Sequence, residues 1–402
     1  MIGDRGCHVP LDRTTLRALA GMTDQIGILS IYVTLDPQRR AESAVRPSWE
    51  VRLRSRLAEI QEQQKRDGPR EHTAGLRARL EALRLDLERL LDPATPGQGR
   101  ALFAGVAGGE VHQVSLQVPL VDQVVLAARA QLRPLVTAWS VAGPAGAVAV
   151  SADEVRVVDL RFGWTEEVAV IDYVNTVEQR ELKGPAAANP AMAQHSAPQQ
   201  DLFARREEDK LLRFLRTVGP RVAGYAARRD WEHLVVTGEA PLVQAVVDGL
   251  PQPWADEVVT LTHPVTTLTR PKLAATVEPA LAGARQRRRQ GLAQQAREAA
   301  MSANTGAFGL GETLDGLQQG RVAHLLLAAD GQWSGSRTPD GLLVPDGEVP
   351  PGVTAGSMTP EPDLGERMIE LAFREGAEVT VLAPPDAAPL AEVDGVGAVL
   401  RW

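Results

Sequence analysis

Apolar positions in the first 140 residues follow two patterns, one typical of buried strands and one of amphipathic helices. Ile26–Leu35 (IGILSIYVTL) is a nearly continuous apolar run that ends at Asp36-Pro37, as expected for a buried strand. From Ser48 to Leu91 the apolar spacing is helical and is interrupted at Arg66–Glu71, which predicts an antiparallel helical hairpin. Three later segments, EVHQVSLQV, QVVLAARA and RPLVTAWSV, indicate further strands of a mostly antiparallel sheet.

The middle of the chain begins after a predicted boundary at Gly143–Gly146 (GPAG). Three strand candidates follow, with hairpin turns at Ala152-Asp153 and Phe162-Gly163. Residues 183–200 contain almost no order-forming residues and predict a long loop. A helix is expected from Asp201 to about Arg229, and EHLVVTGEAPLVQAVVDGLP then predicts a strand, a turn and a helix.

The last third of the chain alternates helical and strand patterns. A long helix from Pro271 to about Ala300 precedes the tract SANTGAFGLG, which is interpreted as a linker. The alternation beyond it predicts a small α/β sandwich, with an irregular insertion at Asp330–Pro362. The predicted class is therefore α/β (α+β), in three domains: an N-terminal mixed sheet with a helical hairpin (1–140), a middle domain (141–302) and a C-terminal α/β sandwich (303–402).

Composition supports a folded, cytoplasmic protein. Hydrophobic residues make up 44% and charged residues 23% of the 402 residues, and no apolar run reaches the length of a membrane-spanning helix. The N-terminus lacks the apolar segment of a signal peptide. Cys7 is the single cysteine, which excludes an intramolecular disulfide and a cysteine-rich zinc site.

The formal net charge of −8 is unevenly distributed. Lys and Arg number 19 against 16 Asp and Glu in residues 1–140, and 19 against 20 in residues 141–302. In residues 303–402 the counts are 5 against 15. This asymmetry indicates two surfaces with different partners, although an acidic domain can also simply be soluble.

The predicted loop and the helix behind it have the layout of an RNA-probing element. A flexible tip on a basic stem suits a cavity walled by RNA, because phosphates attract Lys and Arg without reading sequence. The alternative is an ordinary solvated helix, since Glu207, Glu208, Asp209 and Asp230 lie among the basic residues. The candidate RNA-binding residues are Lys183, His195, Arg205, Arg206, Lys210, Arg213, Arg216, Arg287, Arg288 and Arg289.

Asp201–Ala223 (DLFARREEDKLLRFLRTVGPRVA) resembles the helix that follows the catalytic loop in archaeo-eukaryotic class-1 peptide-chain release factors. The segments LGETLDGLQQGRVAHLLLAAD and LGERMIELAFREGAEVTVLA are similar to the third domain of that family. The resemblance covers most of residues 145–402 and implies a ribonuclease-H-like middle domain. Residues 1–140 resemble the bacterial, Pelota-related branch that includes the hibernation factor Balon, and not the decoding domain.

The chain departs from the family at the catalytic tip. The Gly-Gly-Gln tripeptide and the stop-codon-reading motifs are absent, and Gln194, Gln199 and Gln200 are the only glutamine candidates. Ester hydrolysis needs an aimed water and donors for the oxyanion, which the family's glycines allow the backbone to provide. Pro198 fixes φ and removes an amide hydrogen, so a working catalytic tip is not expected.

No other chemistry-bearing motif stands out. Asp153, Glu154 and Asp159 lie close together in sequence, as do Glu166 and Glu167, but carboxylates near strand turns usually face solvent and no histidine has ligand spacing. Glycines in GAFGLGET have neither the lysine of a P-loop nor dinucleotide-binding spacing. No metal and no cofactor are predicted.

The resemblance implies a factor that enters the ribosomal A site, bound to rRNA, without reading a stop codon. Occupation without reaction would suit hibernation, protection or rescue of ribosomes. A translational GTPase such as elongation factor Tu is the expected partner of the acidic C-terminal domain. The alternatives are a codon-independent peptidyl-tRNA hydrolase in ribosome rescue and a stress-linked protein adaptor.

Overall fold

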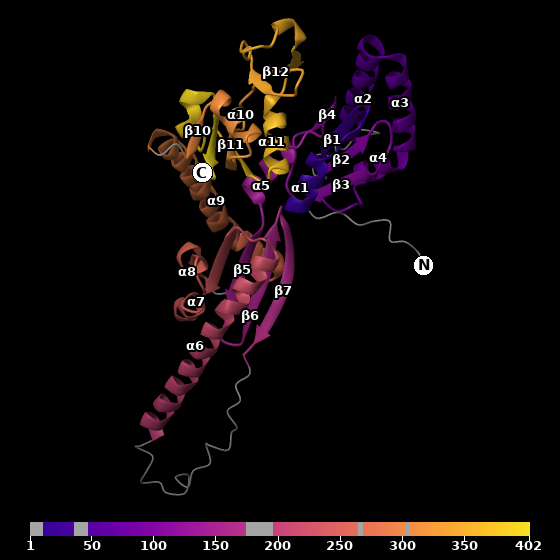
Figure 1. Cartoon of the computed structure of the whole chain (residues 1–402). Coiled ribbons are helices and arrows are strands. Elements are labelled where there is room, and N and C mark those ends of the chain that lie inside the picture. The colour runs from indigo at the N-terminus through magenta and orange to yellow at the C-terminus, as the bar shows by residue number, and fades with distance from the viewer. Residues whose placement is uncertain (1–10, 36–46, 174–195, 264–267, 303–304) are drawn as a thin grey trace. The chain divides into compact units, whose positions relative to one another are not determined.

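The structure is a computed structural model that describes residues 11–35, 47–173, 196–263, 268–302 and 305–402 (Figure 1). It confirms the predicted mixed α/β class, because four sheets are combined with helices. The chain divides into two compact units, one of Met1–Ala142 with Gln286–Trp402 and one of Gly143–Arg285. The division into three domains at residues 140 and 302 stays a prediction.

The unit Gly143–Arg285 contains a five-stranded sheet in the order β7-β6-β5-β8-β9. β6 is antiparallel to both of its neighbours, whereas β5, β8 and β9 run parallel to one another, which is the ribonuclease-H-like arrangement expected of the middle domain. The strands are β5 (Ala145–Val150), β6 (Glu154–Arg161), β7 (Trp164–Asp172), β8 (His233–Gly238) and β9 (Val259–Thr262).

Helices cover both faces of this sheet because its central strands are apolar on both sides. On one face, Val148 and Val150 pack with α6 (Ser196–Arg228) and α7 (Ala240–Val247). On the other, Ala147 and Ala149 pack with the first half of α9 (Arg270–Ser302). The short helix α8 (Trp254–Glu257) precedes β9.

The N-terminal part of the other unit has an antiparallel sheet in the order β3-β2-β1-β4. Trp49, Leu53, Leu83 and Leu90 of the predicted helical hairpin cover one face of the sheet. The elements are α1 (Arg13–Ala20), β1 (Ile28–Thr34), α2 (Ser48–Asp67), α3 (Arg70–Ala82), α4 (Arg84–Leu91), β2 (Gly99–Gly105), β3 (Val111–Leu116), β4 (Gln123–Ala127) and α5 (Arg133–Ala142).

The C-terminal part of the same unit has a sheet in the order β10-β16-β11-β15, in which only β11 and β15 are parallel. Ala293 and Ala296 of α9 pack with Leu326 and Leu390 beside this sheet. The elements are β10 (Gly306–Phe308), α10 (Leu310–Gln318), β11 (Val322–Ala328), α11 (Leu364–Arg374), β15 (Glu378–Leu382), the 3₁₀ helix η6 (Ala388–Val393) and β16 (Val396–Leu400).

Three segments differ from the sequence-based expectation. RPLVTAWSV is not a strand but helix α5, whose buried Leu135, Val136, Trp139 and Ala142 recur at helical spacing against β15. Gly306–Phe308, expected within a linker, is strand β10 and pairs with β16. The insertion Asp330–Pro362 is not irregular throughout, because it holds a small antiparallel sheet of β12 (Gly335–Arg337), β13 (Leu343–Pro345) and β14 (Thr359–Glu361), with the 3₁₀ turn η5 (Ala355–Ser357).

Candidate RNA interface on helix α6

Among the side chains that the structure describes, those that anchor helix α6 on the sheet lie mainly in its second half. The buried side chains Leu215, Val218, Val222 and Ala226 recur at helical spacing and pack with β5 and β6. From Arg205 to Phe214 no side chain is fully buried. With 33 residues the helix is about 50 Å long, so its first half extends past the strands (Figure 1).

Exposed basic side chains form a stripe along α6, opposite the face that is buried. They follow one another at intervals of four, three, eight and seven residues, which at about 100° per residue places them within a sector of roughly 80°. We call this set the α6 basic stripe: Arg206, Lys210, Arg213, Arg221 and Arg228.

Few intramolecular contacts compensate these charges. Of the acidic residues that suggested an ordinary solvated helix, Glu207, Glu208 and Asp209 lie together and Asp230 follows the end of α6, so residues 210–229 contain six basic and no acidic residues. Lys210 lies 3.7 Å from Glu207, and the guanidinium of Arg228 lies 5.0 Å from the ring centre of Tyr225. Among the described residues, Arg206, Arg213 and Arg221 have no ion-pair partner. The stripe is therefore available to an external anion.

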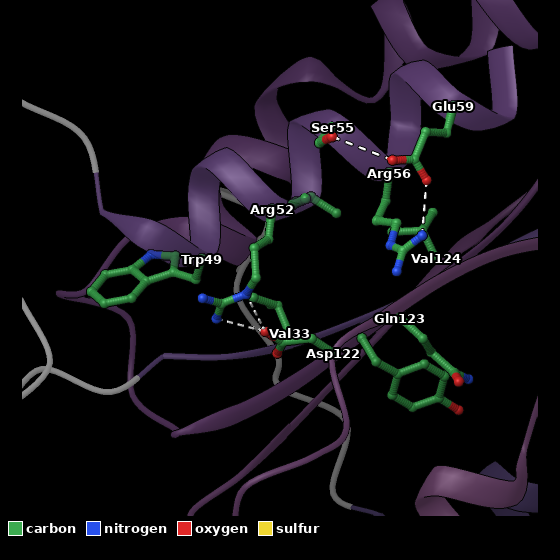
Figure 2. A pocket seen from close by; sticks show the side chains of 11 residues that line it. Val33, Trp49, Arg52, Ser55, Arg56, Glu59, Asp122, Gln123 and Val124 are labelled. Carbon is green, nitrogen blue, oxygen red and sulfur yellow. Dashed lines mark hydrogen bonds and ion pairs between the residues drawn. The ribbon is translucent and has the colours of Figure 1, made fainter. Parts of the chain in front are cut away.

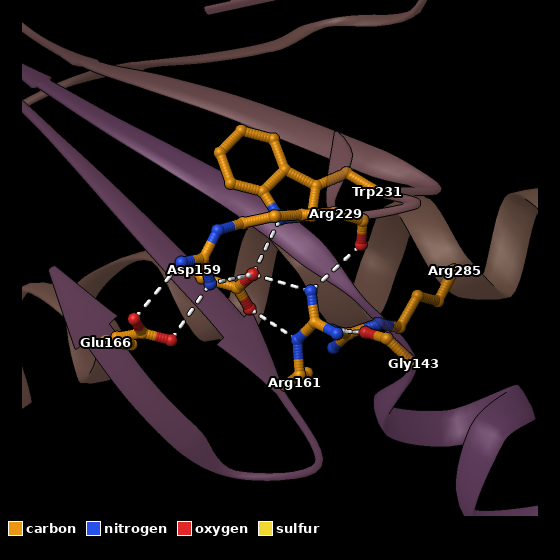
Figure 3. Close-up of polar contacts among 7 residues, drawn as sticks. All are labelled: Gly143, Asp159, Arg161, Glu166, Arg229, Trp231 and Arg285. Carbon is orange, nitrogen blue, oxygen red and sulfur yellow. Dashed lines mark hydrogen bonds and ion pairs between the residues drawn. The ribbon is translucent and has the colours of Figure 1, made fainter. Parts of the chain in front are cut away.

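A buried carboxylate fixes the C-terminal end of α6 to the sheet (Figure 3). Asp159 on β6 is 1% exposed and accepts hydrogen bonds from Arg161 (2.6 and 2.7 Å), Trp231 Nε1 (3.1 Å) and Arg229 (3.1 Å). Arg229 continues to Glu166 on β7 through bonds of 2.9 and 3.1 Å. The hydrogen bond from Arg229 holds the pKa of Glu166 below its usual value. This cluster, the Asp159 clamp, joins the end of α6 to two strands.

The Asp159 clamp corrects one expectation and was not found from the sequence. Asp159 was expected to face solvent near a strand turn, but it is buried under Trp231. Its partners Arg229 and Trp231 come 70 and 72 residues later in the chain, so local patterns could not reveal the contact. The one signal in the sequence is Arg-Arg-Asp-Trp at the predicted helix end, where charged and aromatic residues meet.

Two glycines allow a second anchor in the middle of the buried half. Pro220 lacks the N–H that would bond the carbonyl of Arg216 within the helix. A Cβ on Gly249, just after α7, would lie 2.0 Å from that carbonyl oxygen, and a Cβ on Gly219 would lie 2.2 Å from the carbonyl carbon of Gly249. Both positions therefore require glycine for the backbones to approach so closely.

The predicted tip residues lie only partly within the described chain. Lys183, Gln194 and His195 fall outside the described residues. Gln199 and Gln200 were placed in the loop 183–200, but α6 begins at Ser196, so both have helical backbone.

Pro198 explains the early start of the helix. A proline in the first turn loses no intrahelical hydrogen bond, because the amides of that turn have no partner, and its fixed φ suits a helix. The residue that was interpreted as a loop former is thus compatible with the first turn of α6.

The predicted basic residues of α9 have different surroundings. Arg287 and Arg288 are exposed, whereas Arg289 donates to Asp386 (2.7 Å) and to the carbonyl of Ser140 (2.8 Å). On α6, Arg205 is exposed beside the stripe and Arg216 lies 3.9 Å from Asp248. Arg289 is therefore engaged within the protein, while the other four side chains reach solvent.

The arrangement favours binding over catalysis. A row of exposed guanidinium and ammonium groups, spaced by one to two helical turns, can neutralise phosphates along a nucleic acid without reading bases. In the described part of the chain, no group of three or more His, Cys, Asp or Glu side chains is arranged to hold a metal ion.

Comparison with known proteins identifies the segment that carries this helix. Residues 131–282 match the model of bacterial archaeo-eukaryotic release factor family 10. Over these residues the chain is similar to the archaeo-eukaryotic release factors. The match spans α5, the five-stranded sheet and α6, which confirms the family resemblance noted for Asp201–Ala223. No curated protein matches the sequence.

Solved structures of release factors and Pelota proteins are also similar to this chain. The crystal structure of the archaeal translation termination factor aRF1 is 16% identical, with 98% of this chain and 99% of that chain covered and a TM-score of 0.25. Archaeoglobus fulgidus Pelota is 13% identical, with 75% and 79% covered and a TM-score of 0.30. A model of ribosome-bound archaeal Pelota and ABCE1 is 12% identical, with 97% and 94% covered and a TM-score of 0.40.

None of the helices in the described residues has the length and hydropathy that a membrane span requires.

Proposed function

We propose that the chain is a ribosome-binding release-factor homologue that occupies the A site as a hibernation, protection or rescue factor. The middle domain would enter the site with α6 leading, and the α6 basic stripe would contact rRNA phosphates. Two sequence facts support a factor that neither reads codons nor hydrolyses the ester, because the Gly-Gly-Gln tripeptide and the stop-codon motifs are missing. Such a factor would act in the cytoplasm.

The observation that carries the proposal is the uncompensated charge of α6. Arg213 and Arg221 lie on the face opposite the core, and no acidic residue occurs in α6 beyond Asp209. Binding to phosphates releases condensed counterions, so the predicted affinity falls steeply with salt concentration. The Asp159 clamp supports the same role, because a rigid base is required for the projecting half to hold one direction.

The acidic C-terminal part, residues 303–402, would have a different partner. Its 15 acidic and 5 basic residues disfavour contact with RNA and favour a basic protein surface. A translational GTPase such as elongation factor Tu is the partner that we propose for this part of the chain.

The test is co-sedimentation of the purified chain with vacant bacterial ribosomes at low and high salt. Reversal of three stripe charges, Arg206→Glu, Lys210→Glu and Arg213→Glu, is expected to weaken binding by roughly 100-fold. The matched control Arg66→Glu, Arg70→Glu and Arg77→Glu changes the net charge equally on the helical hairpin and is expected to retain binding. Far-ultraviolet circular dichroism checks that each variant is folded.

The outcome also separates the alternatives. The chain would be a hydrolase and not a passive occupant if it released peptide from peptidyl-tRNA and lost this activity in Gln199→Ala or Gln200→Ala. If the chain does not pellet with ribosomes at low salt, the protein adaptor would be the alternative that remains. Binding that survives the stripe reversal would place the ribosomal contact elsewhere on the molecule.

A further inference from the structure

The edge strand β4 lacks the features that usually prevent strands from pairing with other molecules. Native edge strands are protected by charged side chains, proline, bulges or very short length. β7, the edge of the other large sheet, carries Glu166, Glu167 and Asp172 and has a register shift against β6. β4 is Gln-Val-Val-Leu-Ala, with no charge, no proline and a regular register against β1.

The outer side of β4 has unused backbone hydrogen-bonding groups. Alternate residues of an antiparallel edge strand direct their N–H and C=O groups away from the sheet. In the described part of the chain, no backbone bond joins residues 123–127 to any element other than β1. Val121, two residues before the strand, is 71% exposed. This edge can therefore accept another strand.

A groove runs between this edge and α2 (Figure 2). It consists of two cavities of about 300 and 440 Å³ that share Val124 in their lining. Val124 and Leu126 lie opposite Ile31 and Leu29, on the face of the sheet that α2 covers. Apolar side chains of an added strand would therefore enter the groove beside Val124 and Leu126.

The charges along the groove favour a second copy of the same chain over an unrelated peptide. The groove-facing residues of α2 recur at helical spacing and change sign along the helix, with Arg52 and Arg56 in the first half and Glu59 and Asp67 in the second. Antiparallel apposition of two such helices places the basic half of each beside the acidic half of the other. The pattern is thus self-complementary, as a two-fold interface requires.

We propose that two copies of the chain associate through β4. The strands pair antiparallel about Val125, so that Val124 lies opposite the partner's Leu126. A two-fold axis perpendicular to the sheet keeps both α2 helices on one face, where they lie side by side across the axis. The present pairs Arg52–Asp122 and Arg56–Glu59 are largely exposed, so exchanging them for partner contacts costs little. This association is independent of the proposed ribosomal role.

The first experiment measures the mass of the full chain by sedimentation velocity over a range of concentrations. The expected result is a reversible species of twice the 43.2 kDa chain mass. Val125→Lys places a charge on the edge strand and is expected to raise the dimer dissociation constant more than tenfold. A chain that stays monomeric, or a dimer that Val125→Lys leaves unchanged, would overturn the proposal.

A charge swap tests the arrangement of the helices. Arg56→Glu is expected to weaken the dimer. Exchange of all four groove charges, Arg52→Glu, Arg56→Glu, Glu59→Arg and Asp67→Arg, is expected to restore it, because the fully reversed pattern is again self-complementary. Arg54→Glu on the same helix faces away from the groove and serves as the matched control. Equal weakening by Arg54→Glu and Arg56→Glu would contradict the side-by-side arrangement.

A cross-link tests the register. Val125→Cys in a Cys7→Ser background places a single thiol opposite its own copy, at the short distance of directly paired residues. Oxidation is expected to yield a covalent dimer, whereas Val121→Cys is expected to yield little. A chain that stays monomeric yet binds a synthetic peptide of residues 121–129 would show that the edge accepts a strand while two full-length copies do not associate, which would overturn the proposed dimer.

Discussion

Helices α6 and α9 have the same length, yet they use their basic residues in opposite ways. Each has 33 residues and an internal proline. α9 buries Leu273, Val277 and Leu281 in one core and Ala293 and Ala296 in another. Among the described side chains of α6, the buried ones of its core, Leu215, Val218, Val222 and Ala226, lie in the second half. A helix that is packed along most of its length must satisfy its charges internally, whereas a projecting helix leaves them to solvent or to a partner.

The arginines follow this difference in packing. On α9, Arg285 is 5% exposed and donates to the carbonyl of Gly143, and Arg289 bonds Asp386. On α6, Arg213 and Arg221 have no ion-pair partner among the described residues. Arg285 and Arg289 of α9 thus serve internal stability, whereas Arg213 and Arg221 of α6 are free for intermolecular contact.

The largest effect is expected from removing the Asp159 clamp, which holds the end of α6 on the sheet. Asp159→Ala deletes a buried carboxylate and leaves Arg161, Arg229 and Trp231 without their shared acceptor. Loss of one partner of a buried ion pair costs about 4 kcal/mol. Urea unfolding of the whole chain is expected to show that loss, and ribosome binding should weaken as α6 loses its direction. Glu166→Gln, at an exposed carboxylate of the same cluster, is the control and should have a small effect.

The stability of the two units is expected to depend on pH with opposite sign. In the unit that contains the second half of α9, Glu366 accepts hydrogen bonds from the backbone amides of Leu132 (2.6 Å) and Arg133 (2.9 Å). Burial raises the pKa of Glu366 from 4.5 to about 7. Between these values the folded chain binds a proton that the unfolded chain has lost, so stability falls as the pH rises from 4.5 to 7 and is level above.

The expected loss between pH 5 and pH 8 is about 3 kcal/mol. Glu366→Gln should remove this dependence, which urea titrations at each pH would measure as a difference from the parent chain. The Asp159 clamp has the opposite sign, because the pKa of Glu166 is lowered and its contribution disappears only in acid. A parent chain and a Glu366→Gln variant with parallel pH profiles would contradict the assignment to Glu366.

The sequence was sufficient where the pattern of one element determines its structure. The apolar run Ile26–Leu35 is β1, and the predicted turn at Phe162-Gly163 is a turn in which both residues have positive φ. The prediction of a strand for RPLVTAWSV was wrong, because a short apolar segment has no clear period until its burial against β15 is known. The predicted start of α6 at Asp201 was also wrong, since a proline in the first turn of a helix cannot be told from a proline in a loop by sequence alone.

The candidate site was predictable in its residues but not in their availability. Charge counting selected Arg213 and Arg289 equally. Only the fold shows that Asp386, 97 residues away, bonds Arg289. The Asp159 clamp and the groove beside β4 depend on strand pairing and side-chain burial, which composition and periodicity do not encode.

Arg289→Ala tests whether the basic residues of α9 that have internal contacts stabilise the fold. It leaves the nearly buried carboxylate of Asp386 with Gln290 as its remaining side-chain donor. The expected loss of stability is about 3 kcal/mol, because the carboxylate loses its charged partner. Arg287→Ala, an exposed neighbour on the same helix, should change stability by less than about 0.5 kcal/mol. Thermal or urea unfolding would measure both.

Arg213→Ala tests whether the exposed basic residues of α6 serve intermolecular contact, and it has the smallest expected effect on stability. Its side chain is exposed without an ion-pair partner in the described chain, so the free energy of unfolding should change by less than about 0.5 kcal/mol. Ribosome affinity should fall about tenfold at low salt, and the slope of log affinity against log salt should decrease by about 1. Arg289→Ala, measured under conditions where it stays folded, should leave that slope unchanged. If the two substitutions exchanged these effects, the basic residues of α6 would be structural and those of α9 would bind RNA, which is the reverse of what their packing indicates.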